Sequence, residues 1–186
     1  MVKDQSLAEI WELLEQIPDP EIPVVSIREL GILRDVRLNA QQEIEVTITP
    51  TYSGCPAMGQ IEDDVKAVLK QSNIQAKVIT QLAPAWTTDW MTETAKSKLR
   101  DYGIAPPQHL VDGLNSSSNI IQFATKKVAA CAHSTSVSST FTSQSVPCPR
   151  CESTNTTETS HFASTACKAL YKCLDCLEPF DYFKPY

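Results

Sequence analysis

The chain has 186 residues, of which 42% are hydrophobic, and a formal net charge of -6. This length and composition suffice for one or two packed domains. The acidic balance argues against non-specific nucleic-acid binding, which depends on many Lys and Arg side chains to neutralise phosphates. No apolar run approaches the roughly 20 residues that span a bilayer, and no signal peptide is visible. The sequence therefore predicts a cytoplasmic protein without a membrane segment.

The first part of the chain alternates predicted helices and strands. A capping box at Ser6–Glu9 begins the first helix, Pro18 ends it, and Gly103 ends the last one. The expected elements, in order, are a helix at Leu7–Ile17, strands at Ile32–Leu38 and Ile44–Thr49 with a turn at Asn39–Gln42 between them, a helix at Pro56–Gln71, a strand marked by Ile74, Ala76 and Val78, and a helix at Asp89–Tyr102. Their order, α-β-β-α-β-α, predicts a compact α+β domain over residues 1–111.

Residues 112–147 are expected to form a linker. Nine of the twelve residues from Ser134 to Ser145 are Ser or Thr. Such a segment cannot bury enough apolar area to offset its ordering entropy, which is about 1–2 kcal/mol per residue for the backbone alone. We therefore expect limited proteolysis to cut first between about Asn115 and Ser145, and not inside residues 20–100.

Residues 148–186 are rich in cysteine. Two CxxC pairs, Cys148 with Cys151 and Cys173 with Cys176, are separated by 21 residues. Each pair can place two thiolates at about 2.3 Å from one metal ion, and two pairs complete a tetrahedron. A unit this small lacks the core to fold alone, so metal binding would supply its folding free energy. The spacing predicts a zinc-ribbon-like tetrathiolate domain that holds zinc, while an iron–sulfur centre, which thiolates also bind, stays open.

A fifth thiol, Cys167, lies between the two pairs. It is interpreted either as a small buried residue or as an additional ligand that exchanges with the others or supports an iron–sulfur cluster. Glu152 and Leu177 follow the two pairs, at positions where such turns often have glycine, so we expect slight strain there. The cysteines total seven, an odd number that fits a disulfide framework badly, and cytoplasmic thiols are kept reduced.

Cys55 is the candidate reactive thiol of the first domain. It precedes Pro56, which suits the first position of a helix, so Cys55 is the expected N-cap. The helix dipole would then lower its pKa modestly. Gly54 allows the backbone to approach whatever Cys55 binds, and the alternative is a packing cysteine. No His, Ser or Cys residue has the spacing of a catalytic constellation, so an enzymatic role is not expected.

Seven segments of the chain have the residue patterns of known families. They are Asp19–Pro23, Leu30–Ile32, Thr51–Pro56, Thr87–Trp90, Gly103–Pro107, Ser164–Cys173 and Glu178–Lys184. The segments of the first domain are similar to the SufT-like family of small iron–sulfur assembly domains, and together with the tail they resemble the accessory subunits of ring-1,2-phenylacetyl-CoA epoxidases. The resemblance implies that Cys55 and Asp19 handle iron or a cluster and that the tail cysteines form a ribbon.

The resemblance implies a non-catalytic maturation factor of phenylacetate catabolism. Such a factor assists iron–sulfur cluster or iron insertion into the oxygenase and reductase system, and the iron–sulfur reductase is the expected partner. No nucleic acid or membrane is expected to bind, and a homo-oligomer stays open. One alternative is a non-catalytic structural subunit of the multicomponent complex. A thiol oxidoreductase would need a free CxxC dithiol, and a nucleic-acid-binding ribbon would need a basic surface.

Overall fold

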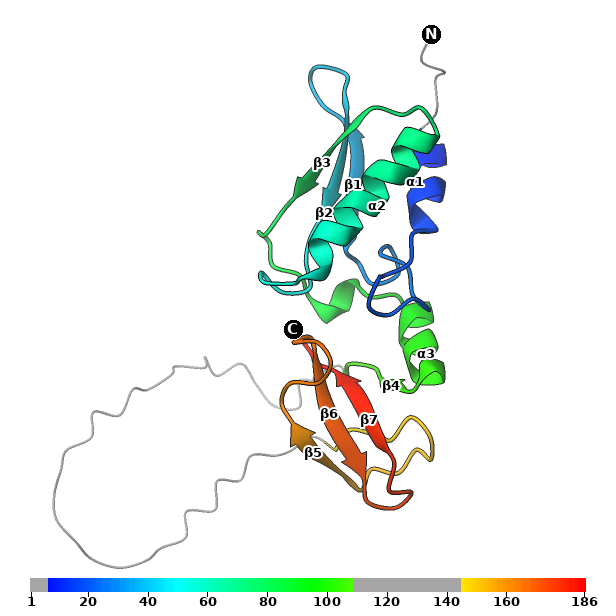
Figure 1. The fold of residues 1–186 in the computed structure, drawn as a ribbon, viewed down its shortest axis with the longest axis vertical. Helices are drawn as coiled ribbons and strands as arrows, with labels where there is room; N and C mark the ends of the chain where they lie inside the picture. The colour runs from blue at the N-terminus through cyan, green and yellow to red at the C-terminus, as the bar shows by residue number, and fades with distance from the viewer. Residues whose placement is uncertain (1–6, 109–144) are drawn as a thin grey trace, which may run out of the picture. The chain divides into compact units, whose positions relative to one another are not determined.

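The computed structural model describes residues 7–108 and 145–186, and these two ranges form one compact unit. The first range contains the expected α-β-β-α-β-α order, which confirms the α+β class. Its first five elements are α1 (Leu7–Glu15), β1 (Leu33–Leu38), β2 (Ile44–Ile48), α2 (Ala57–Gln71) and β3 (Ala76–Thr80) (Figure 1).

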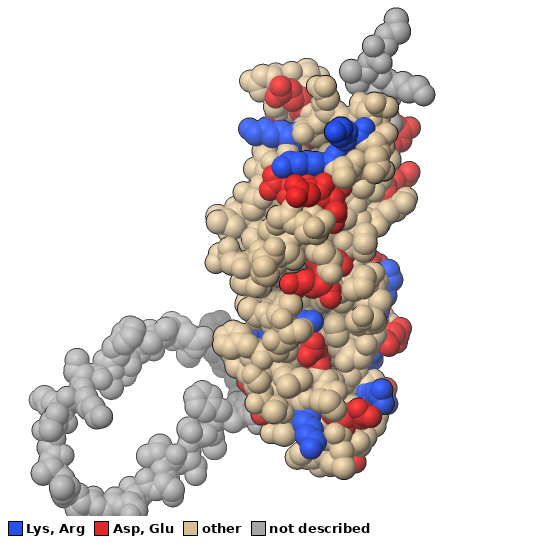
Figure 2. Space-filling model, viewed as in Figure 1, with Lys and Arg blue, Asp and Glu red and all other residues tan. Residues whose placement is uncertain are grey.

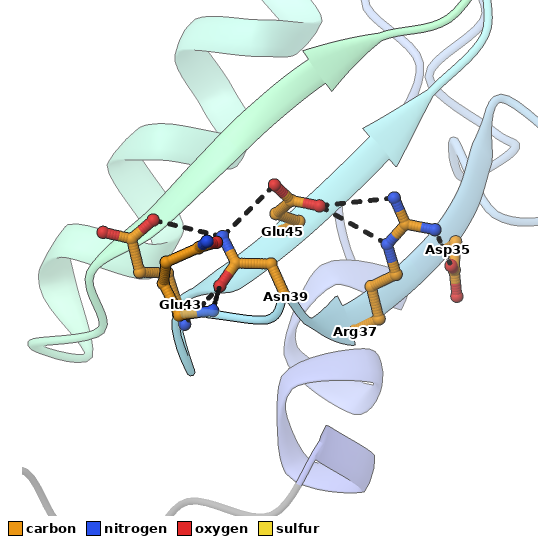
Figure 3. Close-up of polar contacts among 6 residues, drawn as sticks. Asp35, Arg37, Asn39, Glu43 and Glu45 are labelled. Carbon is orange, nitrogen blue, oxygen red and sulfur yellow. Dashed lines mark hydrogen bonds and ion pairs between the residues drawn. The ribbon is translucent and has the colours of Figure 1, made fainter.

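Strands β1, β2 and β3 form a sheet in that order. β1 pairs antiparallel with β2, and β2 pairs parallel with β3. In the expected turn between β1 and β2, Asn39 Oδ1 accepts hydrogen bonds of 2.9 Å from Gln41 N and Glu43 N. Asn39 Nδ2 also donates to Glu43 and Glu45, and Arg37 donates to Glu45 (Figure 3). Polar contacts therefore close this solvent-facing end of the hairpin.

The two helices bury their apolar stripes against the sheet. On α2, Ile61, Val65 and Leu69 recur every four residues and are at most 2% exposed. On α1, Ile10 and Leu14 are fully buried. α1 contacts β1 and α2, and α2 contacts β3. Full burial of such a side chain contributes about 1.5–3 kcal/mol to the free energy of folding. This packing holds the helices and strands in place, and with them the ends of the loops that connect them.

The last helix begins later than the sequence suggested. α3 spans Glu93–Tyr102, whereas a helix from Asp89 was expected. Thr88–Trp90 instead forms a short 3-10 helix, η1, and the backbone at Thr92 is extended. The Thr92 hydroxyl accepts a 3.0 Å hydrogen bond from Ala95 N. This side-chain cap sets the start of α3, because it satisfies a backbone donor that has no partner within the helix.

The tail forms a second sheet. Its antiparallel strands are β5 (Thr156–Ser160), β6 (Lys168–Cys173) and β7 (Pro179–Phe183) (Figure 1). A short strand that the sequence did not indicate, β4 (Ile104–Ala105), pairs parallel with β7. The order in this sheet is β4-β7-β6-β5. A segment that directly follows α3 therefore belongs to the sheet of the cysteine-rich tail.

The domain boundaries at residues 111 and 147 stay predictions. Residues 109–144, which include nearly all of the expected linker and most of its expected proteolysis sites, lie outside the described ranges. Among the helices that the structure describes, none combines the length and the apolar character needed to cross a bilayer. On the face drawn in Figure 2, basic and acidic side chains are interspersed.

Candidate metal centre and the Cys55 loop

The two CxxC pairs meet at one point of the tail. Cys148 and Cys151 precede β5, Cys173 ends β6, and Cys176 lies in the turn before β7. Their four Sγ atoms all lie within 4.8 Å of one another. The Sγ–Sγ distance is 3.7 Å from Cys148 to Cys176 and 3.6 Å from Cys151 to Cys173.

This geometry fits a single metal ion. Four thiolates at about 2.3 Å from a tetrahedral ion lie about 3.8 Å from one another. The observed sulfur spacing is close to that value, so the residues present match a mononuclear tetrathiolate site. Hydrogen bonds from the amides of Cys176 and Asp175 lower the pKa of Cys173 to about 7, which favours the thiolate that a metal requires.

Both metal-binding turns place an L-residue in a left-handed conformation. Glu152 has φ 61° and Leu177 has φ 65°, directly after the second cysteine of each pair. This confirms the strain expected where glycine is usual. The turns are nevertheless tied to each other, because Asn155 Nδ2 donates a 2.7 Å hydrogen bond to Asp175 Oδ1 and Ser153 Oγ donates to Asp175 Oδ2.

Cys55 lies in the loop that leads into α2, and its thiol is half-buried. The expected cap position is wrong: the N-cap is Pro56, and no side-chain hydrogen bond caps the helix there. The expected pKa direction is also wrong. Burial raises the pKa of Cys55, and the carboxylates of Glu21 and Asp19 raise it further, whereas hydrogen bonds from the Ala57 amide and the Thr51 hydroxyl only partly oppose this.

Asp19 lies near Cys55 and is only 6% exposed. Its Oδ1 accepts hydrogen bonds of 2.9 Å from Glu21 N and 2.7 Å from Ile22 N, which shape the loop. Among the described residues, no hydrogen bond to Oδ2 accompanies these two. Burial raises the pKa of Asp19 despite them. Asp19 therefore shapes its loop, and its buried carboxyl group lies near enough to Cys55 for its charge to raise the pKa of that thiol.

Cys167 does not join the four-thiol centre. It is 4% exposed and belongs to the buried cluster of the first range, against which Cys55 and Tyr52 also pack. The Thr165 hydroxyl lies 3.0 Å from its Sγ. Burial raises the pKa of Cys167, and negative charge on Glu21 and Cys55 adds to this. Both thiols therefore belong to the same packed region of the first range.

Sequence reasoning missed Lys168, which is 5% exposed. Its ammonium group lies 3.2 Å from Asp181 Oδ2, and its positive charge lowers the pKa of Asp19 and Glu21, although burial outweighs this effect. A buried cation is costly unless it is paired. No local pattern distinguishes this lysine from an exposed one, since its burial depends on how the tail packs on the first range.

Comparisons with known proteins match both parts of the chain. The iron–sulfur cluster assembly protein family matches residues 7–78, and the PaaD zinc beta ribbon domain matches residues 124–184. A protein of Escherichia coli K12, provisionally named as one of the subunits of 1,2-phenylacetyl-CoA epoxidase, is 44% identical over 95% of this chain and 91% of its own length. An Fe-S protein maturation auxiliary factor of Porphyromonas gingivalis is 32% identical over 51% of this chain and 91% of its own length. A solved DUF59 domain from Bacillus anthracis aligns with a TM-score of 0.45 and 34% identity, over 50% of this chain and 89% of that domain.

The fold and the cysteine centre define a protein that joins a SufT-like iron–sulfur assembly domain to a zinc-ribbon domain. The match at 44% identity extends over nearly the whole of this chain and of its relative. The chain therefore belongs to the PaaD family.

Proposed function

We propose that this chain is an accessory factor of a phenylacetyl-CoA epoxidase system in phenylacetate catabolism. It assists the insertion of iron or an iron–sulfur cluster into the oxygenase and reductase components, with the iron–sulfur reductase as its main partner, and it catalyses no reaction itself. The observation that carries the proposal is the half-buried Cys55 thiol beside the carboxyl groups of Asp19 and Glu21, in the domain that matches the iron–sulfur assembly family. The 44% identical relative supports the client system.

The surroundings of Cys55 suit a transient ligand. Iron binds the deprotonated sulfur, and the raised pKa of Cys55 keeps its thiol protonated until a cation offsets the nearby carboxylates. Binding the cargo then releases a proton, and taking the proton back favours release of the cargo. In the tail, four sulfur atoms surround a single point and would hold a resident ion more firmly.

We assign zinc to the tail centre. A closed set of four thiolates leaves no open coordination position, which is typical of structural zinc sites. The match to a zinc ribbon supports zinc over an iron–sulfur cluster, whose thiolate ligands lie farther apart than those around one ion. Zinc would fold the tail, and its four thiolates would need a reducing compartment such as the cytoplasm.

The test compares Cys55→Ser with wild type in cells that produce the epoxidase components. Serine keeps the size and hydrogen-bonding capacity of the side chain but is a poor iron ligand. We expect normal abundance of the variant with lower iron and sulfide per reductase and slower epoxidation. Cys131→Ser, at a cysteine that no prediction involves, is the matched control. Full iron loading with Cys55→Ser at normal abundance would falsify a cluster-handling role.

A structural component of the oxygenase complex is the second candidate. The name of the Escherichia coli relative, which calls it a subunit, favours this role. In that case the chain co-purifies with the epoxidase components at a fixed stoichiometry, and Cys55→Ser changes neither that stoichiometry nor the iron content of the reductase. A maturation factor instead associates substoichiometrically and depends on the thiol.

A further inference from the structure

One tail thiol is held outside the metal centre. Cys167 lies directly before β6, in a turn where Lys168 N donates a 3.1 Å hydrogen bond to Thr165 O. Lys184 N, just after β7, donates a 3.0 Å hydrogen bond to Cys167 O. The backbone of this cysteine is therefore fixed from two sides, so its thiol is presented in one place by the folded ribbon.

Polar groups of the first range contact the turn that carries Cys167. The Thr165 hydroxyl, 3.0 Å from Cys167 Sγ, also hydrogen-bonds the Glu21 carboxylate. Tyr186 Oη, on the same side, donates a 3.2 Å hydrogen bond to Ala166 O, and Tyr186 O accepts one of 3.3 Å from Thr88 N. These contacts hold the Cys167 turn against the first range at Glu21 and Thr88, and Cys167 lies in the same buried cluster against which Cys55 packs.

The groups gathered here form a donor set for a cation. Two thiols and two carboxyl groups share the site, and Lys168 supplies one positive charge that Asp181 already pairs with. Deprotonation of both thiols would leave an excess of buried negative charge, which a bound cation offsets. Thiolate with carboxylate suits iron(II), cobalt(II) and zinc, and paired thiolates suit iron–sulfur clusters.

The ligand atoms of this donor set lie farther apart than the four sulfur atoms of the tail centre. Within the described residues, the four tail cysteines alone bring three or more ligand atoms within 4.8 Å of one another. The Cys55 group is spaced more widely, so it must contract around a single ion or accept a larger cluster. Either case gives weaker and more readily exchanged binding than a preformed tetrahedral site.

We propose that Cys55 and Cys167 form a second, exchangeable metal site, in which two thiolates from segments far apart in the sequence bind the cargo and the Asp19 and Glu21 carboxylates complete its coordination. This inference rests on the proposed function, because it identifies the ligands of the same iron or cluster. It also gives the ribbon a direct part in that function: zinc folds the ribbon, and the folded ribbon presents Cys167 to Cys55.

The proposal is tested by a titration with cobalt(II) alone, in the absence of oxygen. The titrated protein is the 186-residue chain with its tail zinc in place. We expect one further cobalt ion per chain with sulfur-to-cobalt charge-transfer absorption, since thiolates are its ligands. Cys55→Ser and Cys167→Ser should each remove about half of that absorption and weaken binding at least about tenfold. The double variant should lose the absorption, and Cys131→Ser should keep it. Zinc measured after the titration confirms that the tail centre stays filled.

Two outcomes would overturn the two-thiol site. The first is the absence of cobalt–thiolate absorption in the wild-type protein while its zinc is retained. This outcome is measured on the wild type, so it does not depend on whether any variant folds. The second is cobalt binding by Cys167→Ser, or by Cys167→Ala, that equals wild type. If only Cys55 variants then lower the iron content of the reductase in cells, the proposed function stands with a single thiol. If cobalt binds as proposed but reductase iron is unaffected by Cys55→Ser, the site stands and the function fails.

Discussion

The indole ring of Trp86 packs against the phenyl ring of Phe183, with ring centroids 5.9 Å apart and an angle of 52° between the rings. Trp86 Nε1 donates a 2.9 Å hydrogen bond to Leu30 O, and both aromatic residues are at most 3% exposed. One residue lies in the first range and the other in β7 of the tail. This pair therefore joins the ribbon to the core of the assembly domain.

Phe183→Ala should destabilise both parts together. Removing a buried phenyl ring costs about 3–5 kcal/mol. The three tryptophans, Trp11, Trp86 and Trp90, all lie in the first range, so the midpoint of their fluorescence change in urea reports the unfolding of that range. The signal of Trp86 also responds to the loss of its contact with Phe183, so the midpoint and not the amplitude is compared. We expect the substitution in the tail to lower the tryptophan-detected midpoint. Phe162→Ala, at a ring that is 62% exposed, is the control and should change stability by less than about 0.5 kcal/mol. An unchanged tryptophan transition in Phe183→Ala would show that the two parts unfold independently.

Cys148→Ser and Cys176→Ser should lose the resident metal. Each removes one of four thiolates that meet at one point, and the small tail depends on metal for its folding free energy. Metal analysis of protein purified without chelator should give about one ion per chain for wild type and for Cys55→Ser, and far less for the two tail variants. Equal metal content in all four proteins would contradict the assignment of the centre.

Glu152→Gly and Leu177→Gly should stabilise the metal-loaded protein. A left-handed conformation costs an L-residue about 1–2 kcal/mol, and glycine avoids this cost. Glycine also loses more backbone entropy on folding, which offsets roughly half of the stabilisation. We expect a net increase of up to about 1 kcal/mol each in urea unfolding. Glu152→Ala keeps the strained backbone and serves as the control, so an equal gain there would refute the strain argument.

Asp19→Asn should change the pH dependence of stability. Burial raises the pKa of Asp19 in the folded protein, so its favourable contribution is complete below the unfolded value of 3.8 and is lost as pH rises through the folded value. Asparagine keeps an Oδ1 acceptor for Glu21 N and Ile22 N. The stability of wild type relative to Asp19→Asn should therefore fall as pH rises over this window and then level off.

Glu29→Gln provides a control of opposite sign. Burial disfavours the charge on Glu29, but hydrogen bonds from Lys98 and from Ser26 outweigh it and lower the pKa. Its contribution is present above the unfolded value of 4.5 and is lost as pH falls through the folded value. Urea unfolding across this pH range should give slopes of opposite direction for the two variants. Parallel slopes would mean that burial of Asp19 does not control its titration.

The sequence by itself determined the elements whose signals are local. Hydrophobic spacing predicted both helices that cover the first sheet, and Gly103, with φ 93°, ends α3 as expected. The CxxC spacing predicted the four clustered thiols, and the turn positions of Glu152 and Leu177 predicted strain, which their left-handed backbone confirms. These features depend on backbone geometry over a few residues, which a single sequence records directly.

Only the tertiary structure decided the properties of Cys55 and Cys167. The position of Cys55 before a helix suggested a lowered pKa, but the carboxyl groups and the packing that raise it come from a loop far away in the sequence. In the sequence Cys167 belongs to the cysteine-rich tail, but the packing of the ribbon on the assembly domain places it in the buried cluster against which Cys55 also packs. Desolvation and charge interactions depend on which distant surface covers a group, and spacing along the chain does not specify that surface.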